Sequence, residues 1–486
     1  MTKKNFIIFM TDQHSRKFLS CYRNPIVKTP NLDKLARKGV IFENASTNSP
    51  ICVSARACFS TGIYVHQNKC WDNAIAYDGK IPSWGHYLQK KHIDVVSIGK
   101  LHFRSANDKT GFDEQILPMH IANGVGDVMG SIRPNLPERP QSRKFSEQIG
   151  PGETEYTKYD QNISRKAAEW LKARSKNKKK DNPFLLYVSF IAPHFPLIVP
   201  HKYYNLYKDI ELPNFKKFNS ELLNHPWWIA FNKSITFDNY FRDDLHRREA
   251  IISYLGLCTF VDQLIGNVID ELESTSLQDN TNILFLSDHG ENLGARGLWG
   301  KSVMYEESIG IPMILAGEGL PKGSVVKTPV SLIDVFPSIL DVFGMKETYR
   351  YSGNSLFEIA KKEEDENRLV FSEYHGAGAI SGAFMLRDGQ YKYIHYVNFE
   401  PELYDLQSDP EELVNLATNN KFKEILKNYK NKLFRIVDPN AINNEALADQ
   451  ARLVEKNGGI EKVLMKGGLS GTPVPGGTST RVEINT

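Results

Sequence analysis

Four short, mostly apolar runs, each ending in polar residues, constrain the fold of this 486-residue chain more than any other feature. The runs are Phe6–Met10, Ile93–Ile98, Phe184–Phe190 and Asn282–Leu286, and they precede Asp12-Gln13, Gly99-Lys100, Pro193-His194 and Ser287-Asp288-His289. Such runs are typical of strands that are buried on both faces of a parallel sheet. Because ligands bind beyond the carboxyl ends of such strands, the pattern predicts a sheet that presents polar groups at one edge.

Amphipathic segments between these runs predict helices that cover the sheet. Thr29–Gly39 has a capping threonine, a proline at the first helical position and a terminating glycine. Ile163–Ala173 and the longer stretch Leu245–Leu272 have helical apolar spacing, and Ser331–Asp341 predicts a further helix on the sheet. Strands that alternate with helices indicate an α/β fold.

The pattern changes after about residue 370. Ala383–Tyr396 predicts a hairpin that turns at Asp388-Gly389, and a helix is expected near Lys421–Ile436. We therefore divide the chain into a large α/β domain (1–370), a small α+β subdomain (371–456) and an extended, glycine-rich tail (457–486) that is free to lie on another subunit.

Composition excludes several classes of function. The net charge of +3 predicts neither a nucleic-acid-binding nor a membrane-binding surface. The first apolar run is too short for a signal peptide, and no run is long enough to suggest a membrane span. Five cysteines form an odd set without the spacing of a disulfide framework. We expect a cytoplasmic protein.

Cys52 and Arg56 stand four residues apart within the small-residue stretch Ser49–Gly62. At a helix N-terminus they would share one face, beside free backbone N–H groups that suit an anionic ligand. The alternative is a buried cysteine that acts as a small hydrophobe, next to a paired arginine. No second cysteine or histidine stands at zinc-finger spacing, which argues against a structural metal site at this point.

Two polar pairs, Asp12-Gln13 and Asp288-His289, follow two of the predicted strands. Two carboxylates, an amide oxygen and an imidazole can together hold a divalent cation. Each pair alone is also explained by a capped turn. Together with Cys52 and Arg56, the pairs favour a metal-assisted site.

These residues lie in motifs that resemble the type I sulfatases of the alkaline-phosphatase superfamily, in particular the branch of choline sulfatase and phosphonate monoester hydrolase. The matching motifs are Asp12-Gln13, Thr29–Leu32, Cys52-x-x-x-Arg56 with Thr61-Gly62, Asp72–Ala74, Gly99–Phe103, Pro193-His194, Ser287–Gly290, Gly297–Lys301, Leu403–Leu406, Asp409-Pro410 and Asn415-Leu416. The resemblance runs in the family's order from residue 6 to about residue 417. It implies a large mixed, mainly parallel sheet flanked by helices, with a smaller C-terminal α+β domain.

The resemblance also implies a chemistry. In that family the motif cysteine is oxidised to formylglycine by a formylglycine-generating enzyme, and its hydrate is the nucleophile. Cys52 would take this role, with Arg56 beside it and with Asp12, Gln13, Asp288, His289 and the modified Cys52 around one divalent metal ion. Lys100 and Lys301 would hold the oxygens of the transferred group, and Asn73 would donate to the substrate. His102 would lie beside the hydrate and His194 near the leaving-group oxygen.

Two departures from the family pattern bear on maturation and on the metal. Ser54 stands where the motif usually has proline. Gln13 and His289 stand where many sulfatases have aspartate and asparagine, so Mn²⁺ competes with Ca²⁺ as the expected ion.

Three functions remain open at the level of sequence. The first is a sulfuric ester hydrolase acting on a small-molecule sulfate ester, and the second is a phosphonate monoester hydrolase or phosphodiesterase with the same site. The third is a non-catalytic anion-binding protein with an unmodified Cys52.

The irregular stretches 105–160 and 201–242 are either substrate-binding loops or surface excursions, and Trp71, Phe195, Trp227 and Trp228 are candidates for an aromatic wall. Members of the branch suggest a homodimer or homotetramer.

Overall fold

An eight-stranded sheet forms the centre of the computed structural model, in which residues 4–177, 182–217, 224–345, 351–469, 471–477 and 481–482 are described. The strands occur in the order β11-β2-β10-β9-β1-β7-β4-β5. Their bounds are β11 Ser324–Val326, β2 Val40–Phe42, β10 Met313–Ala316, β9 Thr281–Ser287, β1 Asn5–Asp12, β7 Phe184–Pro193, β4 Asp94–Lys100 and β5 Glu114–Met119. β10 is antiparallel to both of its neighbours, and the other pairs are parallel. The four predicted strands are therefore neighbours at the centre, in a mixed and mainly parallel sheet.

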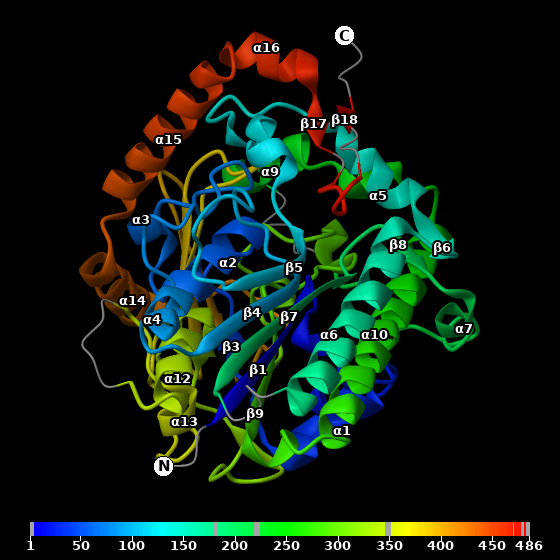
Figure 1. Cartoon of the computed structure of the whole chain (residues 1–486). Coiled ribbons are helices and arrows are strands. Elements are labelled where there is room, and N and C mark those ends of the chain that lie inside the picture. The colour runs from blue at the N-terminus through cyan, green and yellow to red at the C-terminus, as the bar shows by residue number, and fades with distance from the viewer. Residues whose placement is uncertain are drawn as a thin grey trace.

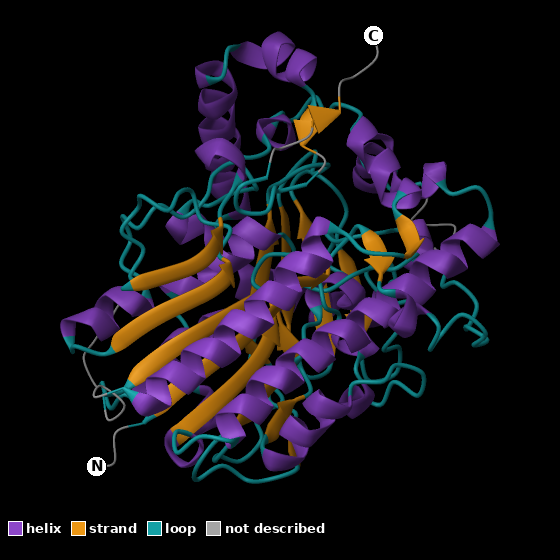
Figure 2. Ribbon diagram, turned by 45° about the vertical axis from the view of Figure 1, so that its right-hand side comes forward, coloured by secondary structure: helices purple, strands orange, loops and turns teal. Residues whose placement is uncertain are grey.

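Helices cover both faces of this sheet, as Figures 1 and 2 show. One layer is formed by α1 (Pro30–Lys38), α6 (Glu155–Lys176) and α10 (Asp244–Glu273), and the other by α2 (Cys52–Thr61), α4 (Trp84–Lys90), α12 (Val335–Val342) and α13 (Leu356–Ile359). Strand β1 shows why its run is apolar throughout. Ile7 and Phe9 pack into the first layer, whereas Phe6, Ile8 and Met10 pack into the second.

The C-terminal part contains a second sheet, which is antiparallel. It consists of β13 (Val370–Tyr374), β14 (Ala383–Arg387), β15 (Tyr391–Tyr396) and β16 (Glu402–Asp405), and the predicted hairpin is formed by β14 and β15. Helix α14 (Lys423–Ile436) packs on this sheet. The α/β fold with a smaller C-terminal domain is confirmed; the residue limits assigned to each domain stay predictions.

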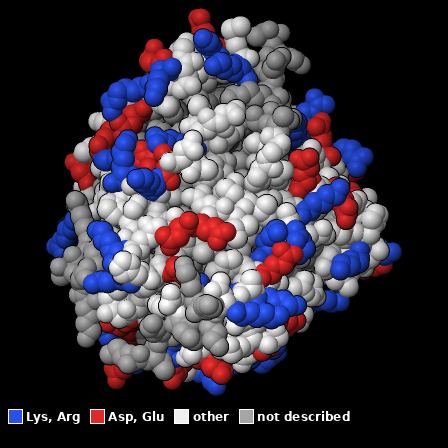
Figure 3. Space-filling model, viewed as in Figure 1, with Lys and Arg blue, Asp and Glu red and all other residues white. Residues whose placement is uncertain are grey.

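The remaining described helices and strands are short or lie after α14, at the C-terminal end of the chain. They are β3 Ala45–Ser46, α3 Val65–Asn68, α5 Arg143–Glu147, β6 Ile149–Pro151, β8 Leu197–Val199, α7 His201–Tyr204, α9 Pro226–Ser234, α11 Glu306–Ile309, β12 Val330–Ser331, α15 Pro439–Lys456, α16 Gly459–Lys466, β17 Gly468–Leu469 and β18 Arg481–Val482. On the face drawn in Figure 3, basic and acidic side chains are interspersed.

Two details differ from the sequence predictions. The tail is not extended throughout, because α16 occupies Gly459–Lys466; residues 470, 478–480 and 483–486 of the tail lie outside the described residues. The side chain of Thr29 does not cap α1. Instead, the carboxylate of Asp262 in α10 accepts hydrogen bonds from the backbone N–H groups of Asn31 (3.2 Å) and Leu32 (2.8 Å).

One helix, α10, is long and apolar enough to cross a membrane, which apolar runs alone did not indicate. In this fold its apolar residues are buried against α1, α6 and the sheet. Its composition is therefore explained by a position in the core.

Candidate active site

The carboxyl ends of four central strands place polar side chains at one edge of the sheet. Asp12 ends β1, Lys100 ends β4, His194 follows β7, and Asp288 and His289 follow β9. Gly99 makes the position of Lys100 possible. Its φ is +102°, and a Cβ atom at this residue would lie 2.2 Å from the carbonyl oxygen of Ser189 in β7. Only glycine lets the two strands approach this closely.

Cys52 is the first residue of α2 and is 2% exposed. Its Sγ lies 3.1 Å from His289 Nε2 and 3.6 Å from Asp12 Oδ1. Asn73 Oδ1 accepts a 3.3 Å hydrogen bond from the backbone N–H of Val53 and so fixes the first turn of the helix. Burial, with the Asp12 carboxylate beside it, raises the pKa of the Cys52 thiol to about 11, so an unmodified thiol is protonated at neutral pH.

Ligand atoms of Asp12, Cys52, Asp288 and His289 all lie within 4.8 Å of one another, and all four residues are buried. Two carboxylates, one imidazole nitrogen and one cysteine-derived group are a donor set that fits a divalent cation. The side chain of Gln13, the fifth predicted ligand, lies beside this cluster, where its Oε1 accepts a 2.6 Å hydrogen bond from Lys301 Nζ. Its role as a metal ligand stays a prediction.

Arg56 donates hydrogen bonds to both carboxylates of this cluster. Its Nε donates to Asp288 Oδ2 (2.8 Å) and its Nη2 to Asp12 Oδ2 (3.1 Å). Lys100 Nζ also lies 2.6 Å from Asp12 Oδ2. Burial would raise the pKa of Asp12, but the charges of Lys100 and Arg56 outweigh it and hold that pKa well below its usual range. Asp12 is therefore ionised at neutral pH and available to a cation.

Lys301 and His194 form a second hydrogen-bonded pair in the site. Lys301 Nζ lies 2.8 Å from His194 Nε2. Burial and the Lys301 charge lower the pKa of His194, so its imidazole is neutral here. The end of β7 before His194 is fixed from α6, since the carboxylate of Asp160 accepts hydrogen bonds from the backbone N–H groups of Ile191 (2.8 Å) and Ala192 (2.7 Å).

Six of the predicted residues, Cys52, Asn73, Lys100, His102, His194 and Lys301, line one cavity of about 150 Å³. Both irregular stretches contribute to it: Ile121, Asp127, Arg139 and Tyr156 come from the first, and Ile235 and Phe237 from the second. Phe195 also lines it. Both stretches therefore contribute to the cavity wall; their role in substrate binding stays a prediction.

The three tryptophans proposed for an aromatic wall do not line this cavity. Trp227 and Trp228 pack under the C-terminal sheet, where both contact Tyr396. Trp71 packs edge-on against His375. Core packing, the alternative for each, explains them.

Two further residues in the site carried no sequence signal. Glu291 accepts a hydrogen bond from Gln13 Nε2 and another, of 2.6 Å, from the backbone N–H of Gly300, and so connects the loop of Lys301 to β1. Thr472, in the C-terminal tail, lies 2.8 Å from His102 through its hydroxyl. The contacts of Glu291 with Gln13 and of Thr472 with His102 join parts of the chain that are far apart in sequence, so no local motif contains either pair.

The sequence profile of the sulfatase family matches residues 4–345, which include all of the predicted site residues. The chain belongs to the sulfatase family. A second profile, the C-terminal region of N-sulphoglucosamine sulphohydrolase, matches residues 294–438 of this sulfatase.

Individual relatives agree with this assignment. The chain is 31% identical to choline-sulfatase of Rhizobium meliloti over 86% of its own length and 83% of the relative. It is 29% identical to arylsulfatase K of Gallus gallus over 90% and 83% of the two chains. Among solved structures, phosphonate monoester hydrolase of Agrobacterium radiobacter has a TM-score of 0.73 at 21% identity, over 91% of this chain and 96% of the other. That likeness shows the shared fold.

Proposed function

We propose that the protein hydrolyses a sulfate monoester through a formylglycine formed from Cys52, assisted by one divalent metal ion. The observation that carries the proposal is the position of Cys52. It begins a helix, lines the cavity and lies within 4.8 Å of the ligand atoms of Asp12, Asp288 and His289. A nucleophile, a cation site and substrate-facing lysines thus meet at one point.

The metal would be held by Asp12, Asp288, His289 and the modified Cys52, with Gln13 as a fifth ligand. When bound, it would supply positive charge that lowers the pKa of the nucleophile and offsets the charge of the ester. The nitrogen donor of His289 among oxygen donors keeps Mn²⁺ beside Ca²⁺ as the proposed ion.

The cavity-lining residues divide into two roles. Lys100 and Lys301 line the same cavity as Cys52 and would bind the sulfate oxygens, where charge gathers during transfer. His194, whose Nε2 lies 2.8 Å from Lys301 Nζ, would lie near the departing oxygen, where protonation helps departure. His102 would exchange the proton of the nucleophile, and Asn73 would bind substrate while it fixes the first turn of α2.

A second candidate is hydrolysis of phosphonate monoesters or phosphate diesters. The fold shared with phosphonate monoester hydrolase favours it, and the same two lysines suit a tetrahedral phosphoryl anion. The values of kcat/KM for an aryl sulfate and for a phenyl phosphonate monoester, measured on one preparation, decide between the two activities.

The test of the proposed function begins with the tryptic peptide Gly39–Arg56 of protein that has been coexpressed with a formylglycine-generating enzyme. We expect its mass to show an aldehyde, or its hydrate, in place of the thiol, and we expect the protein to hydrolyse an aryl sulfate. Cys52→Ala should abolish turnover, whereas Cys21→Ser, at a half-buried cysteine outside the cavity, should retain it. An unmodified Cys52 together with sulfate binding but no turnover would instead favour the anion-binding protein.

A further inference from the structure

The C-terminal tail returns to the catalytic cavity of its own chain. Figure 1 shows the tail, in red, turning back after α16 and descending between α9 and α5. Leu469, Gly471 and Thr472 are part of the cavity wall. The tail predicted to be free for another subunit thus contributes to the site within this chain.

Contacts on both sides of Thr472 hold this part of the tail in place. Before it, Gly468 packs so closely against Gln141 that a Cβ atom would lie 2.2 Å from Gln141 Nε2. After it, Val474 packs against the central core. At Thr472 itself, the Tyr156 hydroxyl in the first turn of α6 donates to the backbone carbonyl. The threonine hydroxyl is therefore set at a fixed place in the cavity.

That hydroxyl contacts one of the predicted catalytic residues. Thr472 Oγ1 lies 2.8 Å from His102 Nε2, and His102 is 5% exposed. The other ring nitrogen, Nδ1, is buried and has no hydrogen-bond partner among the described residues. Within the described part of the chain, this imidazole is thus oriented by a single hydrogen bond, whose partner belongs to the tail.

We propose that Thr472 is a positioning residue for His102, and that the tail is a necessary wall of the active site rather than an appendage. The hydroxyl occupies Nε2 and leaves Nδ1 as the nitrogen that serves the reaction. Loss of the hydroxyl would leave a buried ring nitrogen unpaired, which favours rotation of the ring or a change of tautomer. This inference rests on the proposed function for its kinetic consequences, but the hydrogen bond itself can be tested without turnover.

The kinetic test compares Thr472→Val, which keeps the shape and removes the hydroxyl, with Thr472→Ser, which restores it. For an aryl sulfate we expect Thr472→Val to lower kcat by ~10–100-fold, with KM changed less than ~3-fold, because a catalytic group loses its orientation while the sulfate-binding lysines stay. Thr472→Ser should recover most of the rate. Thr418→Val, at an exposed threonine before α14, is the matched control and should leave kcat unchanged. Equal kcat values for wild type and Thr472→Val would overturn the proposal.

A second measurement does not depend on activity or on the modification of Cys52. Ring ¹⁵N chemical shifts of histidine-labelled protein report hydrogen bonding at the ring nitrogens of His102, and the His102→Gln variant identifies the His102 signals among those of the 13 histidines. We expect the same Nε2 shift in the wild type and in Thr472→Ser, and a different shift in Thr472→Val, which lacks the hydrogen bond. Identical His102 shifts in all three proteins would refute the positioning role. A wild type that shows the expected shifts but hydrolyses no sulfate ester would refute the proposed function and leave the positioning role standing.

Discussion

Replacing Arg56 with lysine should cost the protein about 3–5 kcal/mol of unfolding free energy, although the charge is kept. Arg56 is 1% exposed, and its guanidinium contacts the carboxylates of Asp12 and Asp288. It donates hydrogen bonds to Asp288 Oδ2 (2.8 Å), Asp12 Oδ2 (3.1 Å), the Lys100 carbonyl (2.9 Å), Ser189 Oγ (2.9 Å) and Tyr187 Oη (3.2 Å).

The magnitude follows from the geometry of the donors. A lysine ammonium offers three donors from one nitrogen, so it cannot reach acceptors arranged around a planar fork. At least two buried acceptors, one of them a carboxylate, would lose their partner. An unsatisfied buried group costs about 1–3 kcal/mol, and more when it is charged. Their sum agrees with the cost of breaking a buried ion pair.

Urea unfolding at pH 7 in the presence of EDTA measures this cost without a contribution from bound metal. Arg165→Lys is the matched control: Arg165 is an exposed residue of α6 paired with Glu169, and we expect a change below about 0.5 kcal/mol. An unfolding free energy of Arg56→Lys within about 1 kcal/mol of the wild-type value would refute the view that the guanidinium holds the carboxylates in place. That limit is about one-third of the smallest expected loss.

Adding a divalent cation to the wild type and to Arg56→Lys tests the metal site. A divalent cation between Asp12 and Asp288 would stabilise the native state by mass action, and we expect Mn²⁺ or Ca²⁺ to raise the unfolding midpoint of the wild type. No rise in either protein at saturating ion would contradict the proposed metal site.

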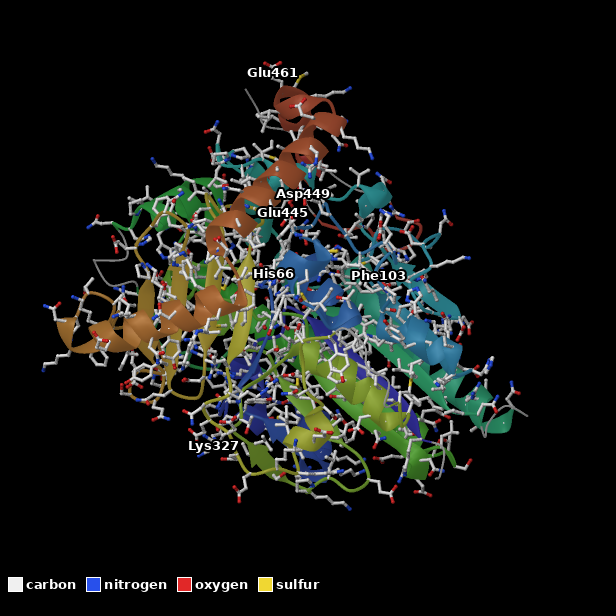
Figure 4. All side chains as sticks on the ribbon, turned by 90° about the vertical axis from the view of Figure 1, so that its left-hand side faces the viewer. His66, Phe103, Lys327, Glu445, Asp449 and Glu461 are labelled. Atoms are coloured by element: carbon white, nitrogen blue, oxygen red, sulfur yellow. The ribbon has the colours of Figure 1, made fainter. Side chains whose placement is uncertain are left out.

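Two further predictions concern residues outside the cavity. Gln450 of α15 donates to Asp72 Oδ2 (2.8 Å), and α15 also holds Trp71 through Asp449 (2.7 Å), in the region labelled in Figure 4. Gln450→Ala should therefore lower kcat/KM and raise hydrogen exchange in residues 69–76, whereas the exposed Gln263→Ala should do neither; unchanged exchange would count against this anchor. Burial opposes ionisation of Glu373, but hydrogen bonds from His375 and His66 lower its pKa from 4.5 to about 2. Because the folded pKa is depressed, Glu373 contributes stability above its unfolded pKa that is lost as the pH falls through its folded pKa, about 3 kcal/mol in all. Glu373→Gln should flatten the pH dependence of unfolding free energy between about pH 5 and pH 2, and parallel curves for the two proteins would contradict this.

The centre of the fold was predictable because its signal is local. A strand that is buried on both faces is apolar at nearly every position, as Phe6–Met10 is, and its polar successor marks the functional edge. Asp12, Lys100, His194 and Asp288 were found in this way. Cys52 and Arg56 were found because one helical turn separates them, which brings both side chains to the same side of α2.

Sequence patterns failed where burial depends on the partner. Trp227 and Trp228 stand in an irregular stretch and appear suited to a binding wall, but they pack under the C-terminal sheet. The apolar composition of α10 has the same ambiguity, since a core helix and a membrane span share it. The cap of α1 was assigned to Thr29, the local residue, yet Asp262 supplies it from more than 200 positions away. No local pattern encodes a contact of that kind.

The division between what was predicted and what was missed follows the chemistry of the site. Lys100 and His194, which are proposed to act on the transferred group, stand at the ends of sheet strands, where the backbone geometry is repeated and a motif can form. Residues of the outer wall, such as Asp127, Phe237 and Thr472, come from two irregular stretches and the tail, which meet only in three dimensions. The hydrogen bond between Thr472 and His102 spans 370 positions. Because these walls surround the space left for the leaving group, substrate selectivity should depend on the segments with the weakest local pattern. Exchanging the tail should therefore alter the relative kcat/KM of different sulfate esters more than it alters the metal dependence of the reaction.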